Sequence, residues 1–371
     1  MKKKILFLIP TLGHGGAERV LVNLVNNLDQ NKFDITIQTL FDVGINRQYI
    51  LPHIKYIPGY KRQFRGNSYL IKLFSPKLLY KHIVKNEYDI VISYLEGPTT
   101  RVIAGCSAVM TKKICWIHSG FETVEQATRC FNSMKEACAA YNSYDKIIAV
   151  SQGVREHFTN HLTTHTDIEV LYNTNETEQI QLKAQLPMDD FKCDSSTPVV
   201  CSVGKLIQVK RFDRLLNVHK RLIDEGIYHR IIIVGTGEQK RELEQSIQKY
   251  GLEESFILIG FKENPYPYMA HCNFYICSSQ REGFSTAVTE ALIVGTPVVS
   301  TDCSGARELL GEHDEYGLVV ENSEEGIYRG MKRMLENPEL MAHYKKQAEL
   351  RGKAFSREKT VKAVERMLDS L

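Results

Sequence analysis

The sequence lacks the patterns that mark a disulfide-rich, zinc-binding or membrane-spanning protein. Its nine cysteines are odd in number and scattered, and no two form a Cys-x-x-Cys pair, so we expect free thiols in a reducing cytosol. No apolar run is long enough to cross a bilayer. The apolar core of Met1–Pro10 is too short for a signal peptide, and we expect it to form a buried strand instead.

Acidic residues are absent from Val43 to Asn86, where basic residues alternate with aromatic and aliphatic ones. Such a basic, amphipathic segment is typical of a membrane-surface contact, and equally of a solvated basic face above an ordinary core. We keep both interpretations, with the membrane surface as working hypothesis. Nucleic acid is not expected, because the net charge is +3 and the basic bias is confined to this segment. The candidate acceptor or membrane-surface residues here are Lys61, Arg62, Arg65 and Lys72.

The order of apolar runs and amphipathic stripes predicts two doubly wound α/β domains. A chain of 371 residues is long enough for two or three cores. Compact apolar runs, separated by helical patterns, are typical of buried parallel strands. We expect strands at 5–9, 35–41, 90–94, 114–117, 146–150 and 170–173, and, beyond a polar break, at 199–203, 228–234, 256–260, 274–277 and 297–301.

Ser278 to Gly295 is the most informative stretch for function. Glu282 and Glu290 are separated by seven residues, and a helical pattern begins between them with Ser285 or Thr286 as its N-cap. The unpaired N–H groups of a helix start attract phosphate, whereas the carboxylates would repel it and would accept hydrogen bonds from hydroxyl groups. The pattern fits a nucleotide sugar, with an ordinary αβ unit carrying surface glutamates as the alternative.

Other candidate residues follow predicted strands, where α/β sheets place their sites. Gly15 and Gly16 would let a phosphate approach a helix start, although such a glycine turn is often only packing. His118 and Glu96 are polar groups in the loops after two strands, and a lone histidine is more often structural. Asp42 follows the second strand, as in dinucleotide-binding domains, which keeps a dehydrogenase as a rival interpretation.

In this order, the motifs resemble those of the GT-B glycosyltransferases, specifically the retaining glycosyltransferase family 4. The resemblance runs from Lys4 to about Leu371. The matching pieces are Gly15-Gly-Ala-Glu-Arg19, His118, Val170-Leu-Tyr-Asn173, Gly204-Lys-Leu with Lys210, Gly235-Thr-Gly237, Ser278 to Ala291 and Gly295-Thr-Pro-Val-Val.

The resemblance implies a role for each matching residue. Glu290 would hold the ribose, and Glu282 and His118 would contact the donor sugar. Lys205, which stands where many relatives carry arginine, and Lys210 would stabilise the departing β-phosphate. The remaining implied donor contacts are Gly15, Gly16, Phe284, Ser285, Thr286 and Ala287.

The resemblance also implies a domain plan in which two Rossmann-like domains face each other across a cleft. Residues 1–175 would bind the acceptor and 198–355 the nucleotide sugar. A linker would occupy 176–197, and a helix at 356–371 would pack back on the first domain.

The expected activity is retaining transfer of a hexose-type sugar from a nucleotide sugar, with UDP favoured by family frequency. The acceptor would be a saccharide or lipid-linked saccharide of bacterial polysaccharide or glycolipid synthesis. We expect no metal and no other cofactor, because no Asp-x-Asp triplet occurs in the chain. We favour same-face attack over a covalent intermediate, with Glu96 as the candidate nucleophile for the latter.

The expected location is cytoplasmic, with peripheral contact at the inner face of the plasma membrane as a further hypothesis. Alternatives are a nucleotide-sugar 2-epimerase or a phosphorylase on the same fold, or a non-catalytic partner subunit of a transferase.

Overall fold

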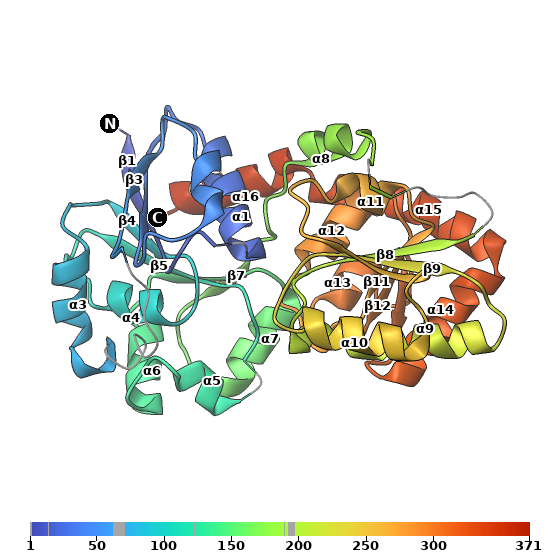
Figure 1. Ribbon diagram of the computed structural model, residues 1–371. Helices are drawn as coiled ribbons and strands as arrows, with labels where there is room; N and C mark the ends of the chain where they lie inside the picture. The colour runs from blue at the N-terminus through green and yellow to red at the C-terminus, as the bar shows by residue number, and fades with distance from the viewer. Residues whose placement is uncertain (1, 14, 62–70, 122, 189, 192–196) are drawn as a thin grey trace. The chain divides into compact units, whose positions relative to one another are not determined.

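The chain folds into two compact units of similar size. One contains Met1–Asn175 together with Arg357–Leu371, and the other contains Glu176–Ser356. The computed structural model describes residues 2–13, 15–61, 71–121, 123–188, 190–191 and 197–371 (Figure 1). Within these ranges no helix combines the length and the apolar character needed to cross a membrane.

The first unit is built on a seven-stranded, wholly parallel sheet in the order β3-β2-β1-β4-β5-β6-β7. Its strands are β1 Lys3–Ile9, β2 Phe33–Thr39, β3 Lys55–Ile57, β4 Ile90–Ser93, β5 Lys112–Ile117, β6 Lys146–Ala149 and β7 Ile168–Val170. Its helices are α1 Gly16–Asn27, η1 Ile45–Tyr49, α3 Pro76–Ile83, α4 Pro98–Ala104, α5 Val124–Thr128, α6 Met134–Tyr141, α7 Gln152–His161 and α16 Arg357–Asp369.

The second unit repeats this plan with a six-stranded parallel sheet in the order β10-β9-β8-β11-β12-β13. Its strands are β8 Val199–Val203, β9 Arg230–Val234, β10 Phe256–Gly260, β11 Phe274–Cys277, β12 Val298–Thr301 and β13 Leu318–Val320. Its helices are α8 Thr177–Ala184, η2 Gln208–Lys210, α9 Phe212–Asp224, α10 Lys240–Tyr250, α11 Tyr266–Ala270, α12 Thr286–Ile293, α13 Ala306–Leu310, α14 Glu324–Glu336, α15 Pro338–Gly352 and η3 Lys353–Phe355.

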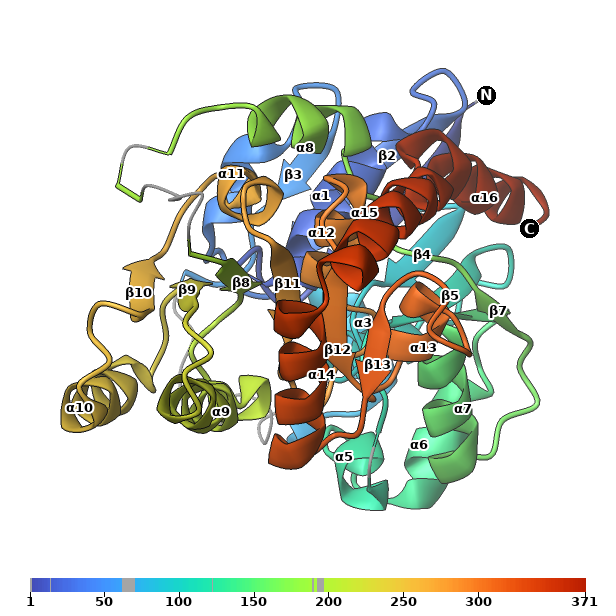
Figure 2. The same cartoon turned by 90° about the vertical axis from the view of Figure 1, so that its right-hand side faces the viewer.

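Helices cover both faces of the second sheet, so its central strands are buried on both sides. Figure 1 shows α9 and α10 on one side of β8 and β9, and α11 and α12 on the other. Helix α15 packs beside α12 (Figure 2). This explains why strands such as β8 read as continuous apolar runs and not as alternating ones.

The last helix, α16, belongs to the first unit. The Lys3 ammonium donates to the carbonyl of Leu368 at 2.8 Å, and the Asp29 amide donates to the Glu365 carboxylate at 2.8 Å. The apolar stripe of α16 is buried, with Val364 and Leu368 almost fully inaccessible to solvent. The helix therefore completes the core of a unit from which it is far removed in sequence.

The predicted α/β class with parallel sheets is confirmed, with local corrections. The last strand of the first unit runs from Ile168 to Val170, and not over 170–173 as expected. Strands β3 and β13 were not predicted, because each has three residues and lies at a sheet edge, where the apolar run is short. Helix α8, which lies in the stretch expected to be a linker, belongs to the second unit and packs against α11 and α12.

Candidate functional site

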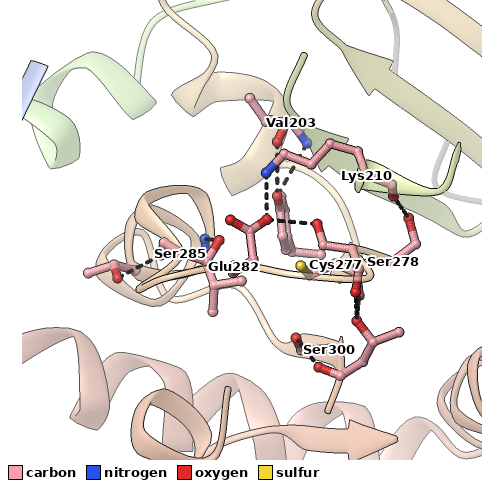
Figure 3. Close-up of polar contacts among 12 residues, drawn as sticks. Val203, Lys210, Cys277, Ser278, Glu282, Ser285 and Ser300 are labelled. Carbon is pink, nitrogen blue, oxygen red and sulfur yellow. Dashed lines mark hydrogen bonds and ion pairs between the residues drawn. The ribbon is translucent and has the colours of Figure 1, made fainter. Parts of the chain in front are cut away.

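An ion pair between Lys210 and Glu282 forms the centre of the candidate site in the second unit. Lys210 ends η2, and Glu282 lies in the loop between β11 and α12. The Lys210 Nζ atom lies 2.5 Å from Glu282 Oε1 (Figure 3). The Ser279 hydroxyl donates to the same oxygen at 2.7 Å. The structure thus brings together two residues that are 72 positions apart.

The loop that carries Glu282 is held by side-chain hydrogen bonds to its backbone. The Thr301 hydroxyl donates to the Ser279 carbonyl at 2.6 Å, and the Asn322 amide donates to the Gln280 carbonyl at 2.9 Å. The Ser278 hydroxyl donates to the Lys210 carbonyl at 2.8 Å. These bonds fix the loop from β12 and from the segment after β13, so the ion pair is preorganised.

Burial and charge act in opposite directions on Lys210. Burial alone would lower the pKa of its ammonium group, but the Glu282 carboxylate, together with the nearby Cys277 and Cys303 side chains, more than offsets this and the pKa is raised. Lys210 therefore stays positively charged at neutral pH. Nearby, a hydrogen bond with the Cys303 thiol lowers the pKa of Cys277 to about 7.

Helix α12 begins where the sequence predicted. Ser285 is its N-cap, and the Ser285 hydroxyl accepts a hydrogen bond from the Val288 amide at 3.4 Å. Glu290 lies on this helix and accepts a hydrogen bond from the Tyr266 hydroxyl at 3.2 Å. Both glutamates of the motif are therefore tied by a neighbouring hydroxyl group, Glu282 by Ser279 and Glu290 by Tyr266.

The other predicted donor contacts of the second unit differ in how far they are exposed to solvent. Thr286 and Ala287 are half-buried in the first turn of α12, while Phe284 is buried with its ring 5.9 Å from that of Phe355. Lys205 is exposed just beyond β8 and forms no ion pair with a carboxylate of the described residues.

In the first unit, the Glu18 carboxylate lies at the start of α1, where phosphate binding was expected. Gly15 is the N-cap, and Glu18 in the first turn folds back until it occupies the space that a side chain on Gly15 would fill. An acidic group here is stabilised by the helix dipole. A phosphate approaching Gly15 or Gly16 would require Glu18 to move.

His118 and Glu96 lie together after β5 and β4. The Glu96 carboxylate accepts from the His118 amide at 2.8 Å and from the Ser119 hydroxyl, and burial raises the pKa of Glu96. Burial lowers the pKa of His118 to about 3, so the imidazole is neutral at pH 7. Its Nε2 atom is buried without a hydrogen-bond partner among the described residues.

The basic residues of the acid-free segment are only partly described. Lys61 is exposed, and Lys72 is half-buried with its carbonyl accepting from Asn132 at 3.2 Å. Arg62 and Arg65 lie outside the described residues.

The dehydrogenase alternative requires Asp42 to bind a ribose. The Asp42 carboxylate instead pairs with Arg47 at 3.2 Å and accepts a hydrogen bond from the Tyr56 hydroxyl at 2.7 Å, which weakens that alternative. In the described part of the chain, no three His, Cys, Asp or Glu side chains gather in a metal-binding arrangement.

Sequence reasoning missed three residues that shape these sites, namely Ser279, Tyr266 and Glu18. Ser279 could have been noticed three residues before Glu282, a spacing that suits a local hydrogen bond. Tyr266 lies 24 positions from Glu290, and no sequence spacing indicates such a pair.

Two family models match the chain, one on each half. The model described as Glycosyltransferase Family 4 matches residues 14–179, and the model described as Glycosyl transferases group 1 matches residues 188–351.

Curated relatives match over most of the chain. An N-acetylgalactosamine-N,N'-diacetylbacillosaminyl-diphospho-undecaprenol 4-alpha-N-acetylgalactosaminyltransferase of Campylobacter jejuni is 31% identical over 376 residues, covering 96% of this chain and 97% of the relative. The amylovoran biosynthesis glycosyltransferase AmsD of Erwinia amylovora is 26% identical and covers 86% and 87% of the two chains.

Solved structures share the fold along the whole chain. Alr3699/HepE of Anabaena, in complex with UDP, has a TM-score of 0.77 at 19% identity and covers 100% of both chains. A sucrose-phosphate synthase of Thermosynechococcus elongatus has a TM-score of 0.78 at 16% identity and covers 99% of both chains. At these identities the likeness shows the fold, which is GT-B.

Proposed function

Because this chain belongs to the group 1, family 4 glycosyltransferases and is therefore a transferase enzyme, we propose that it moves a hexose-type sugar from a UDP-sugar to a saccharide or lipid-linked saccharide. The setting would be synthesis of a bacterial surface polysaccharide or glycolipid. Relatives named for amylovoran biosynthesis and for an undecaprenol-linked acceptor support this choice. A solved structure with a similar fold, Alr3699/HepE of Anabaena, contains UDP-glucose, which supports the proposed donor class.

One observation carries the proposal. The charged Lys210 is paired with Glu282 in the loop directly before α12, and Glu290 lies on α12 itself. In the proposed complex, Glu290 accepts hydrogen bonds from the ribose hydroxyls and Glu282 from the donor sugar. The backbone of residues 284–287 lies at a helix start and is suited to phosphate. Lys210 then faces the β-phosphate as it departs.

The proposed reaction is retaining transfer without a metal. The bond between the anomeric carbon and the β-phosphate oxygen breaks, and the electron pair leaves with UDP. An acceptor hydroxyl attacks from the same face, and its proton passes to the departing phosphate oxygen. Lys210 stabilises the anion as it develops, and the exposed Lys205 assists it. The neutral imidazole of His118 would serve as a hydrogen-bond partner for the donor sugar and not as a cation.

Acceptor binding is proposed for the first unit, where Glu96 and His118 meet after β4 and β5. Glu96 is held by the His118 amide and by Ser119. We assign it to acceptor hydroxyls and not to nucleophilic attack, because its two carboxylate oxygens already accept hydrogen bonds from the His118 amide and the Ser119 hydroxyl.

The test is a panel of nucleotide sugars, with thermal shift for binding and acceptor-dependent UDP release for transfer. We expect one UDP-sugar to stabilise the protein and to release UDP at a rate that rises with a lipid-linked saccharide. A product isomer formed without acceptor would instead support an epimerase. If no nucleotide sugar in the panel binds, the proposal is wrong.

A further inference from the structure

Six lysines surround an open hollow at one edge of the first unit. The hollow has a volume of about 1040 Å³ and lies between α3, the turn that follows α4, and the start of β1. Helices α3 and α4 pack side by side there (Figure 1). We call this surface the lysine face, and it is formed by Lys2, Lys3, Lys4, Lys77, Lys81 and Lys85.

The positive charge of the lysine face is only partly neutralised by the protein. Two carboxylates, Glu87 and Asp89, line the same hollow, so six lysines against two acids leave an excess of four positive charges. None of the six lysines forms an ion pair with a carboxylate of the described residues. Lys3 donates to the carbonyl of Leu368, and Lys85 to that of Lys81. Like charges held this close favour an anionic partner.

Exposed apolar side chains project at the rim of this basic surface. Val109 and Met110, in the turn after α4, are 95% and 88% exposed. Leu78 lies on α3 between Lys77 and Lys81 and is also largely exposed. The turn is fixed from behind by the Thr111 hydroxyl, which donates to the Tyr88 carbonyl at 2.8 Å. A soluble anion would leave these apolar side chains exposed to water, whereas a lipid bilayer would bury them.

We infer that the lysine face docks on a phospholipid bilayer with anionic headgroups, and that Val109 and Met110 enter the boundary between headgroups and acyl chains. The inference goes beyond the proposed function, because it concerns where the protein is held and not how an acceptor reaches the candidate residues. It moves the expected membrane contact from Lys61 and Lys72 to the far end of the same acid-free segment and to the chain's first residues.

This docking leaves the candidate residues of the first unit uncovered. The lysine face lies at the amino ends of β1, β4 and β5, whereas Gly15, Glu96 and His118 follow the carboxyl ends of these parallel strands. The seven residues of β1 separate the two edges by roughly 20 Å. A bilayer at the lysine face would therefore not block these residues.

Flotation of the full chain with vesicles tests the inference. We expect binding to vesicles of phosphatidylglycerol and phosphatidylcholine, none to phosphatidylcholine alone, and release in about 1 M salt, where the Debye length falls to about 3 Å. Lys77→Gln with Lys81→Gln should weaken partition about 25-fold, since each lysine near an anionic surface contributes about fivefold. Val109→Ser with Met110→Ser should weaken it at unchanged charge.

The matched control is Lys345→Gln with Lys346→Gln, an exposed lysine pair on α15 that changes the net charge equally. Equal loss in this control, or no flotation of the unchanged protein, would overturn the inference. Saturable binding of inorganic phosphate without vesicle binding would also overturn it. UDP binding is measured in parallel by thermal shift: its persistence in the Lys77 and Lys81 variant separates a docking defect from a failure of the proposed function.

Discussion

At the scale of single residues, Lys210 is held in place by an ion pair. Its ammonium group is about four-fifths buried and is satisfied by Glu282 at 2.5 Å. A buried ion pair contributes little to stability, because desolvation offsets the attraction. Its value in this loop is therefore better explained by the positioning of a cation than by folding.

Lys210→Met should reduce the rate of transfer by about 10²–10³-fold, the range seen when one group that stabilises a developing anion is removed. Lys205→Met should cost less, because Lys205 is exposed and solvent screens its charge. The measurement is kcat for UDP release with acceptor.

A folding control accompanies this comparison. Lys210→Met leaves the Glu282 carboxylate without its cation and should lower the thermal midpoint, and Glu282→Gln added to it should restore much of that loss. If the double variant regained activity as well as stability, Lys210 would have no role in the chemistry.

The sequence predicted the residue types of the site better than their contacts. The N-cap Ser285 and the placement of Glu290 on α12 follow from helical periodicity and capping. The hydrogen bond of Tyr266 to Glu290 depends on side-chain packing that no spacing encodes. Glu18 stands three residues after the N-cap Gly15, a spacing at which a glutamate can fold back toward the N-cap. Lys205 is exposed whereas Lys210 is largely buried, and this difference also depends on packing.

At the scale of elements, continuous apolar runs predicted the central strands well, because both faces of a parallel sheet are covered by helices. Strands β8, β10 and β11 begin and end where the sequence indicated. The edge strands β3 and β13 have only three residues each, too few for a pattern, and their position depends on the strands beside them.

A buried histidine pair joins α9 to the segments just before β9 and β10. His219 on α9 lies 2.9 Å from His229 and 2.9 Å from the Ser255 hydroxyl, and both imidazoles are almost fully buried. Burial, reinforced by the charge of His229, lowers the pKa of His219 to about 3. His219 therefore stays neutral in the folded protein while it takes up a proton near pH 6.5 in the unfolded chain.

This pair should make the second unit sensitive to acid. Stability contributed by the neutral His219 is complete above pH 6.5 and is lost as the pH falls toward 3, by about 1.4 kcal/mol at pH 5.5. Urea unfolding followed by circular dichroism at pH 7.5 and 5.5 measures it. His219→Leu should be less stable at pH 7.5 and depend less on pH; equal pH dependence in both proteins would contradict the assignment.

At the scale of the whole molecule, α16 ties the end of the chain to its beginning. The helix buries Leu368 in the first unit, and Lys3 donates to the carbonyl of that residue. The single tryptophan, Trp116, lies in β5 of the same unit. Its fluorescence therefore reports on the unit that α16 completes.

Leu368→Ala should destabilise the first unit by about 2–5 kcal/mol, since it removes a fully buried side chain. The expected result is a lower urea midpoint of Trp116 fluorescence. Leu350→Ala is the matched control, because Leu350 on α15 is 56% exposed. A Trp116 midpoint that does not move in Leu368→Ala would show that α16 contributes nothing to this core.

The most direct measurement is a calorimetric titration of UDP into the protein and into Glu290→Gln. If Glu290 holds the ribose by hydrogen bonds to a charged carboxylate, the variant should bind UDP about 10- to 100-fold more weakly. Glu339→Gln, an exposed glutamate on α15, should bind as the unchanged protein does. Equal UDP affinity in Glu290→Gln would contradict the account.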